Sequence, residues 1–249
     1  MLRIEFLGCP VDSLSMEEAI ERVCQFVRDG QPHVVTAINA NKLWHMSTDR
    51  RLRNLVANSE MAIPEYAVVW GAARLGTPLR AHIGGVMLLK ALLPVMATRG
   101  YRPFFLGARP EVTELMVAKL SSDFPGLKVA GFHHGYFGGS EESVLATVRR
   151  AQPDVLFVAL GTPRQEYWID ENRMTLGVPV LMGVGGSFDV LAGLKADAPS
   201  WARSRGLEWL YRLAQEPRAY WKRYLVTNPW LVWQVLKAKM GAREAPKAT

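Results

Sequence analysis

The chain has few of the residues and spacings that mark several large protein classes. It contains only two cysteines, Cys9 and Cys24, and they show no CxxC or other metal-binding spacing. Two isolated thiols favour buried, reduced cysteines and a cytosolic compartment over a disulfide-bonded secreted protein. The five histidines show no ligand spacing, and no DxD motif occurs. The sequence therefore predicts no metal site.

Long apolar runs are also absent. No window reaches about eighteen uninterrupted apolar residues, so we expect no transmembrane helix. The first fifteen residues include acidic residues and no long apolar segment, which argues against a signal peptide. A chain of 249 residues with 49% hydrophobic composition is nevertheless large enough to bury a full core. We expect one domain with a terminal appendage.

The net charge of +7 is concentrated at the C-terminus. Residues 200–249 hold ten Lys or Arg and three Asp or Glu, whereas residues 1–199 hold twenty of each sign. The same C-terminal segment holds five of the eight tryptophans and three of the seven tyrosines. Basic residues among Trp and Tyr suit a membrane interface, where each basic residue contributes about 1 kcal/mol near an anionic surface. We therefore expect peripheral attachment to the inner, cytoplasmic face of an anionic cell membrane.

Two other interpretations of this segment stay open. A solvated charged helix could pack its tryptophans on the core. A surface for single-stranded nucleic acid also combines basic and aromatic residues. We expect no nucleic-acid partner, however, because the segment contains apolar residues that phosphate binding does not need. These are Leu225, Val226, Leu231, Val232, Val235 and Leu236.

Apolar runs alternate with helical patterns, which predicts an α/β fold with a Rossmann-like, mostly parallel sheet and helices on both faces. The expected strands are Val34–Ile38, Met61–Ile63, Pro103–Leu106, Lys128–Ala130, Asp154–Leu160 and Val178–Gly183. The expected helices are Ser15–Asp29, Ala40–Ser59 with a break near Asp49, Tyr66–Leu75, Gly85–Thr98, Pro110–Ser122 and Ser140–Ala151. We divide the chain into an α/β core (1–199), a helical membrane-associating appendage (200–240) and a disordered tail (241–249).

Two of the apolar runs end in glycine-rich motifs. Residues 154–160 lead into GTPRQE at 161–166, and residues 178–182 lead into GVGGSFD at 183–189. In open parallel sheets, ligands bind beyond the carboxyl ends of the strands, where glycines let backbone amides approach an anion. We expect a phosphorylated ligand there; a turn without a ligand is the alternative, because GVGGSFD lacks the full GxGxxG spacing. The candidate binding residues are Gly107, Gly161, Pro163, Glu166, Gly185, Gly186 and Asp189.

A third motif makes the pattern more specific. GTPRQE, GVGGSFD, an AP pair before Trp201 and GLEWLYRLAQEP at 206–217 follow one another in this order. Together they resemble the WecG/TagA/CpsF family of bacterial glycosyltransferases over about residues 34–225. The resemblance implies transfer of a sugar such as N-acetylmannosamine from a UDP-sugar to a polyprenyl-diphosphate-linked saccharide, in cell-surface polysaccharide synthesis. It also implies a metal-independent enzyme; we expect inverting chemistry and no cofactor.

The resemblance suggests three catalytic residues. The family has an aspartate followed by glycine where this chain has Glu65 and Tyr66, so Glu65 is the candidate base. Asn39 matches the asparagine of the family's first motif, and Gln165 lies in the best preserved motif; both could orient sugar hydroxyls. The alternatives are that Glu65 only stabilises a helix dipole and that Asn39 and Gln165 only cap helices.

Other candidate residues would hold the donor. Arg212, Arg218 and Arg223 match arginines that the family brings near the active site, and a guanidinium fork suits diphosphate oxygens. We hypothesise that Arg212 or Arg218 stabilises the UDP leaving group. Tyr136, in the expected loop 131–139, could stack on uracil or could instead close the core.

The chain also departs from the family pattern. Ala37 replaces a threonine, residues 80–88 lack an expected acidic residue and leave only Arg80 as a cation, and Asp197 stands where arginine is common. A noncatalytic nucleotide-sugar or lipid-carrier binding protein of a polysaccharide assembly complex is therefore the alternative to an enzyme. The apolar segment Gly85–Met96 additionally allows a homo-oligomer contact.

Overall fold

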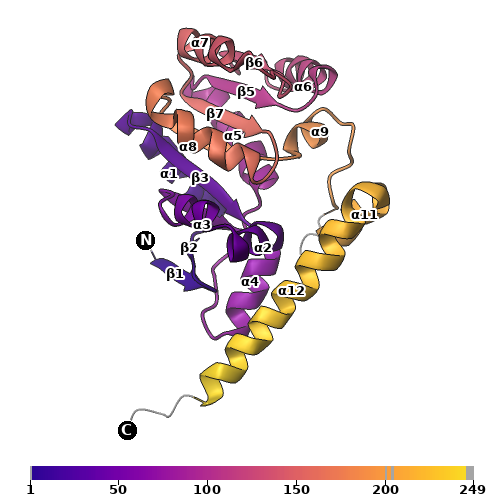
Figure 1. The fold of residues 1–249 in the computed structure, drawn as a ribbon. Helices are drawn as coiled ribbons and strands as arrows, with labels where there is room; N and C mark the ends of the chain where they lie inside the picture. The colour runs from indigo at the N-terminus through magenta and orange to yellow at the C-terminus, as the bar shows by residue number, and fades with distance from the viewer. Residues whose placement is uncertain (1, 200, 203–204, 245–249) are drawn as a thin grey trace.

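The computed structural model describes residues 2–199, 201–202 and 205–244, and its centre is a six-stranded parallel sheet with helices on both faces (Figure 1). The strands lie in the order β4-β3-β8-β7-β5-β6. Their bounds are β3 His33–Ile38, β4 Met61–Pro64, β5 Pro103–Gly107, β6 Gly131–His133, β7 Val155–Ala159 and β8 Val180–Gly183. The predicted Rossmann-like α/β class is confirmed.

Helices connect successive strands and cover the sheet. The helices before the C-terminal segment are α1 Met16–Asp29, α2 Ala40–Thr48, α3 Arg50–Ala57, α4 Tyr66–Arg74, α5 Gly85–Arg99, α6 Pro110–Asp123, α7 Glu141–Ala151, α8 Arg164–Leu176 and α9 Ser187–Leu191. Phe157 and Met182 pack on one face with α1, α5, α6 and α9. Their neighbours Leu156 and Leu181 pack on the other face with α7 and α8. Both faces are buried, as expected for apolar parallel strands.

Helix boundaries follow local capping. Ser15 precedes α1 in a capping box, because its hydroxyl accepts from the Glu18 amide and the Glu18 carboxylate accepts from the Ser15 amide. The predicted break near Asp49 is confirmed. Asp49 has an extended backbone, and its carboxylate accepts from the amide of Leu52, so it ends α2 and begins α3.

An antiparallel hairpin of β1 (Leu2–Phe6) and β2 (Cys9–Ser13) precedes the sheet and was not expected from the sequence. Its anchor is Asp12, which is fully buried and ion-paired with Arg3 at 2.7 Å. The Asp12 carboxylate also accepts from the backbone amide of Ala62 at 2.8 Å. The hairpin is thereby fixed to β4, the strand that ends just before Glu65.

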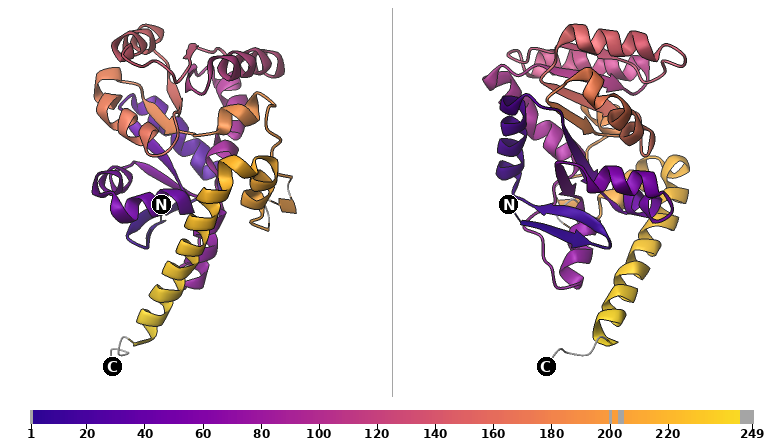
Figure 2. Two further views of the ribbon diagram at one scale, coloured as in Figure 1. Left: turned by 45° about the vertical axis from the view of Figure 1, so that its right-hand side comes forward. Right: turned by 60° about the vertical axis from the view of Figure 1, so that its left-hand side comes forward.

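The C-terminal segment forms a helical arm made of α11 (Glu208–Gln215) and α12 (Pro217–Glu244). In both views of Figure 2, α12 leaves the body of the molecule as one long helix. A narrow stripe holds α12 against α2 and α4. Its buried residues are Tyr224, Thr227, Leu231 and Val235. A Cβ at Gly71 would lie 2.5 Å from the ring of Phe6 and 3.1 Å from Val235, so glycine lets both side chains approach α4 closely.

Most tryptophans of the arm do not join this stripe. Trp209, Trp221 and Trp233 are 38%, 47% and 58% exposed, whereas Trp230 packs against the core. The interpretation in which the tryptophans pack on the core therefore holds for Trp230 alone among these four. No helix of the described segments is long and apolar enough to cross a lipid bilayer.

Several expectations were wrong. Residues 128–130 are not a strand; β6 begins directly after them, inside the segment 131–139 that we expected to be a loop. Gly131 permits this close strand, because a Cβ there would lie 2.7 Å from the ring of Phe104. Residues 241–244 continue α12 and are not disordered, and residues 245–249 lie outside the described part. The possible homo-oligomer contact stays a prediction, although the apolar residues of α5 on which it was based are mostly buried in the core.

Candidate active site

Asn39 and Glu65 meet where two neighbouring parallel strands end. Asn39 follows β3 and Glu65 follows β4, and the register pairs Ile38 with Pro64. The Asn39 amide nitrogen donates to Glu65 Oε1 at 3.1 Å. The Asn39 oxygen accepts from the backbone amide of Lys42 at 2.9 Å, so the residue also caps α2. Asn39 therefore caps α2 and also hydrogen-bonds the candidate base, and its expected role with sugar hydroxyls stays a prediction.

Glu65 occupies the N-cap position of α4, yet its side chain makes no capping hydrogen bond. Burial is the main cause that raises its pKa, and the nearby Glu208 raises it further. Arg212, the Asn39 hydrogen bond and Arg223 act in the opposite direction. A carboxyl whose pKa is raised toward the working pH suits general acid-base chemistry.

The charges around Glu65 come mainly from the arm. Arg212 is ion-paired with Glu208 one turn away on α11. Burial opposes the charged form of Arg212, but the carboxylates of Glu208 and Glu65 outweigh it and raise the arginine pKa. Arg223 lies over the ring of Tyr224 at 5.5 Å, and its buried Nε has no hydrogen-bond partner among the described residues. Arg218, by contrast, is exposed.

Gln165 ties the two glycine-rich loops together. Its side-chain oxygen accepts from the amides of Gly161 at 3.2 Å and Gly185 at 3.0 Å. Gln165 is only 3% exposed, and a Cβ at Gly183 would lie 2.6 Å from its amide nitrogen. These two glycine amides, which we expected to face an anion, are thus used inside the protein. An anion at this rim needs other donors.

Glu166 belongs to a buried charged network below the rim. Its Oε1 lies 2.9 Å from Lys42 Nζ and 2.9 Å from the Gln165 amide nitrogen. Lys42 is 2% exposed and also donates to the Thr36 hydroxyl at 2.7 Å. Because burial of both charges excludes water, the pair fixes geometry more than it adds stability. Sequence reasoning missed Lys42, since a single lysine in a helical pattern gives no signal of burial.

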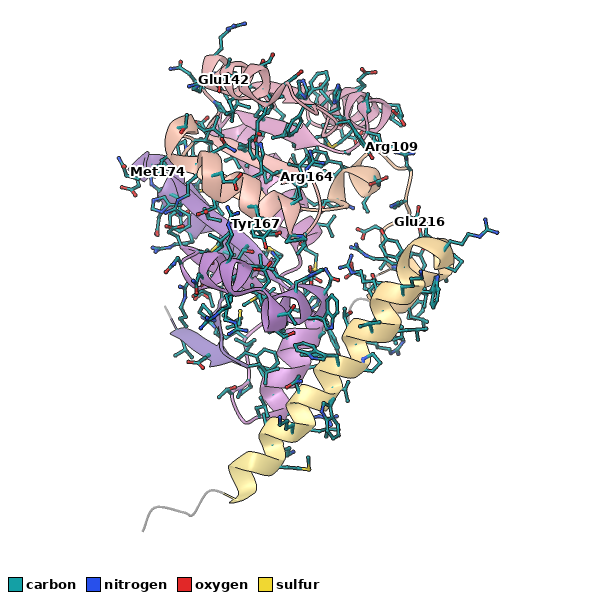
Figure 3. All side chains as sticks on the ribbon, in the orientation of Figure 1. Arg109, Glu142, Arg164, Tyr167, Met174 and Glu216 are labelled. Carbon is teal, nitrogen blue, oxygen red and sulfur yellow. The ribbon has the colours of Figure 1, made fainter. Side chains whose placement is uncertain are left out.

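A second group of loops carries Tyr136 beside Gly107. Gly107 has φ +128°, and a Cβ there would lie 2.5 Å from the Ala159 carbonyl, so only glycine fits. Arg164, labelled on α8 in Figure 3, donates to the carbonyl of Gly135 at 3.2 Å. Tyr136 itself is 68% exposed, so its ring is accessible to a ligand and does not close the core. Pro163 follows a cis peptide bond at the start of α8.

A groove joins the β8 loop to the arm. Gly186, Lys195, Arg212 and Tyr220 line it. Lys195 pairs with Asp189 at 3.7 Å and with Glu216 at 3.0 Å. Glu216 lies where α11 meets α12, as Figure 3 shows. The candidate Asp189 therefore helps to hold Lys195 between the sheet and the arm.

A cavity of about 250 Å³ lies among β3, α3 and α8 and reaches Gly183 at the end of β8. Glu166, Asp170 and Arg173 line it, but Glu65 does not. Because the raised-pKa carboxylate and the arm arginines are elsewhere, we place the candidate site at the rim.

The departures from the family pattern have local partners. Arg80 pairs with Glu18 on α1 at 2.6 Å, so its charge is engaged away from Glu65. Asp197 pairs with Lys90 at 2.8 Å. Within the described residues, no group of three or more His, Cys, Asp or Glu side chains is arranged to hold a metal ion.

A Rossmann-like sheet with a half-buried carboxylate and arginines at its carboxyl rim is an arrangement that suits enzymes which transfer a group from an anionic leaving group. Residues 4–245 match the glycosyl transferase WecG/TagA/CpsF family, and the chain belongs to it. The resemblance expected from the motifs is confirmed.

Two relatives illustrate the similarity. The N-acetylglucosaminyldiphosphoundecaprenol N-acetyl-beta-D-mannosaminyltransferase of Staphylococcus aureus strain MW2 is 29% identical over 248 residues, which cover 98% of this chain and 96% of the relative. The enzyme of the same name from Bacillus subtilis strain 168 is 36% identical over 193 residues, which cover 77% of this chain and 75% of the relative.

Proposed function

We propose that the protein transfers an N-acetylmannosamine-like sugar from a UDP-sugar to a polyprenyl-diphosphate-linked saccharide in cell-surface polysaccharide biosynthesis. The names of the relatives, which specify an N-acetylglucosaminyldiphosphoundecaprenol acceptor and an N-acetyl-beta-D-mannosaminyl group, support the acceptor and the transferred sugar. The UDP donor is what the family resemblance implies. The observation that carries the proposal is the Glu65 carboxylate, held by Asn39 at 3.1 Å and flanked by the charge of Arg212.

Glu65 acts as the general base in an inverting, single displacement. Its carboxylate takes the proton from the acceptor hydroxyl while that oxygen forms a bond to the anomeric carbon of the donor sugar. The bond between the anomeric carbon and the diphosphate oxygen breaks, and UDP leaves with the electron pair. A positioned carboxylate base is worth about 10² to 10⁴ in rate.

Arg212 balances the charge of the departing diphosphate. Its guanidinium lies near Glu65 and also lines the groove that begins at Gly186. Because the amides of Gly161 and Gly185 are engaged with Gln165, the arginine is the stronger candidate for this role. Arg223 supports it with a second cation close to Glu65. Tyr136 offers an exposed ring on which uracil can stack.

The arm brings the site to the lipid acceptor at the inner face of the cell membrane. One side of α12 packs on α2 and α4, which leaves a second apolar side uncovered. The exposed residues of this side are Trp221, Leu225, Val226, Val232, Trp233, Leu236 and Met240. Lys222, Lys237 and Lys239 are exposed on the same helix. Apolar rings and chains beside cations suit an anionic bilayer surface.

A transfer assay tests the proposal. Purified protein in detergent is incubated with UDP-N-acetylmannosamine, or with other UDP-sugars, and a polyprenyl-diphosphate-linked N-acetylglucosamine; the lipid product and free UDP are measured by chromatography. We expect equal amounts of extended glycolipid and UDP with at least one donor. Binding of UDP-sugars without transfer from any of them would instead support the noncatalytic binding protein.

A further inference from the structure

Tyr66, directly after the candidate base, lies in contact with the chain that leads into the arm. We call residues 205–207 the connector, because they precede α11. An ideal Cβ at Gly206 would lie 1.9 Å from Cε1 and 2.2 Å from Cδ1 of the Tyr66 ring. The backbone of Gly206 therefore rests directly on this ring. The ring also meets the side chain of His82 edge-on, with centroids 5.8 Å apart.

Two independent features make glycine necessary at position 206. Its φ is +70°, which L-residues with side chains rarely adopt, and the Tyr66 ring fills the space that a side chain would need. The large residue at position 66 and the small one at position 206 thus fit one another.

Few buried contacts hold α11, the helix after the connector, against the body of the molecule. None of its residues is buried, although the Trp209 ring meets Tyr224 of α12 edge-on, with centroids 5.9 Å apart. At its far end, Gln215 exchanges hydrogen bonds with the backbone of Ala196, and the next residue, Glu216, pairs with Lys195. At its near end, where Glu208 and Arg212 approach Glu65, the connector rests on the Tyr66 ring.

We propose that Tyr66 is a positioning residue for the transfer reaction. Its ring fixes how closely the connector approaches the start of α4 and so places Arg212 opposite Glu65. The inference rests on the proposed roles of Glu65 and Arg212. It assigns to Tyr66 no contact with substrate. Its effect is transmitted through Gly206 and α11.

The first experiment measures how firmly the arm is docked and does not depend on enzyme activity. Hydrogen exchange of the α11 amides is compared in the wild-type full chain and in Tyr66→Ala, Tyr66→Phe and Gly206→Ala. Losing the ring should accelerate exchange of these amides by about tenfold or more, whereas Tyr66→Phe should stay within about twofold, because it keeps the ring. Amides of α6, which is remote from the connector, serve as the internal reference for global unfolding.

A double mutant separates the steric clash with Tyr66 from backbone strain at position 206. Gly206→Ala introduces both effects, but in a Tyr66→Ala background only the strain at φ +70° remains. Gly76→Ala is the matched control, since Gly76 has φ +86° and a Cβ added there would meet no atom within 4 Å. Gly206→Ala should thus disturb α11 exchange far more in the wild type than in Tyr66→Ala, where it should resemble Gly76→Ala. Equal effects in both backgrounds would overturn the contact.

Kinetics complete the test. Tyr66→Ala should lower kcat by about tenfold with little change in KM for the donor, and Tyr66→Phe should restore kcat. Normal kcat in Tyr66→Ala together with fast α11 exchange would overturn the positioning role. If the wild type transfers no sugar, the proposed function fails, but the exchange data still decide whether Tyr66 docks the arm. Unchanged α11 exchange in Tyr66→Ala would refute the inference by itself.

Discussion

The rim of the sheet and the arm supply polar groups to the site in opposite ways. At the rim, Lys42, Gln165 and Glu166 are at most 9% exposed and bond to one another or to loop amides. In the arm, α11 has no buried residue, and the Arg212 side chain is 32% exposed. The rim is therefore a preorganised scaffold, whereas the arm is a docked part that completes the charge around Glu65.

This contrast separates the residues that build the site from those that act in it. Gln165 and Glu166 belong to the most recognisable motif, yet their polar atoms face the interior. Arg212 and Arg223 lie in the C-terminal segment, whose positive charge predicted membrane attachment. In the structure both arginines lie near the candidate base. Mutations in the buried network of Lys42, Gln165 and Glu166 should thus change stability first, and mutations of Glu65 or in the arm should change turnover or membrane binding first.

Replacing the base is the largest expected effect on activity. Glu65→Gln keeps the shape of the side chain but removes the proton acceptor, so kcat should fall by about 10² to 10⁴. Thermal stabilisation by UDP should persist, because the substitution leaves Gly186 and Arg212, which line the groove between the β8 loop and the arm, unchanged. Turnover within twofold of wild type would exclude Glu65 as the base and place the chemistry elsewhere on the rim.

The pH dependence of the same residue gives a second measurement. The base must be ionised to accept a proton, and burial raises its pKa. A plot of kcat/KM against pH should therefore rise with a midpoint above the ordinary carboxyl pKa of 4.5. The raised pKa means that the folded state holds the proton more tightly than the unfolded state. Ionisation of Glu65 thus costs stability as pH rises from the unfolded pKa through the folded one. Denaturant unfolding should show Glu65→Gln as more stable than wild type at neutral pH, and the gap should close in acid.

The rim is tested by Lys42→Met. This change leaves Glu166 as an uncompensated buried charge and should lower the free energy of unfolding by about 3–5 kcal/mol in urea titrations. Adding Glu166→Gln should recover most of that loss, because the remaining amide still accepts from Gln165. Lys128→Met, at an exposed position, is the matched control and should stay within about 0.5 kcal/mol of wild type. A small effect of Lys42→Met would show that water reaches the pair.

The arm is tested by Arg212→Ala, which should lower kcat by about tenfold or more while leaving the urea midpoint nearly unchanged. The side chain is partly exposed, and its interaction with the leaving group is proposed to strengthen as the bond breaks. Arg212→Lys should retain part of the rate, because it keeps the charge and loses the planar fork. Arg99→Ala, at the far end of α5, controls for loss of a partly exposed arginine. Wild-type rates for Arg212→Ala in detergent would reject its role with UDP.

The sequence was most informative where one periodicity decides the structure. The apolar strands and the break at Asp49 follow from local patterns. The positions of Asn39 and Glu65 at strand ends were expected, but the hydrogen bond between them was not. Contacts between distant segments could not be predicted, because no local pattern reports them. Examples are the burial of Lys42 against Glu166 and the fit of Gly206 on Tyr66.

The smallest expected effects concern the exposed face of α12. Trp233→Ser and Leu225→Ser remove side chains that are 58% and 64% exposed, so the fold should tolerate both. If this face enters an anionic bilayer, each change should weaken binding to vesicles of anionic phospholipid by about fivefold, or about 1 kcal/mol, in flotation assays.

A matched surface residue on the body of the molecule makes this last comparison specific. Met174 on α8 is 71% exposed and lies away from the arm in Figure 3. Met174→Ser should leave vesicle binding unchanged, because the proposed membrane face is confined to α12. Equal losses for Met174→Ser and Trp233→Ser would indicate that any exposed apolar side chain contributes to binding, wherever it lies. Loss confined to the α12 variants, with unchanged turnover on a detergent-solubilised acceptor, would separate membrane attachment from the chemistry proposed for Arg212 and Glu65.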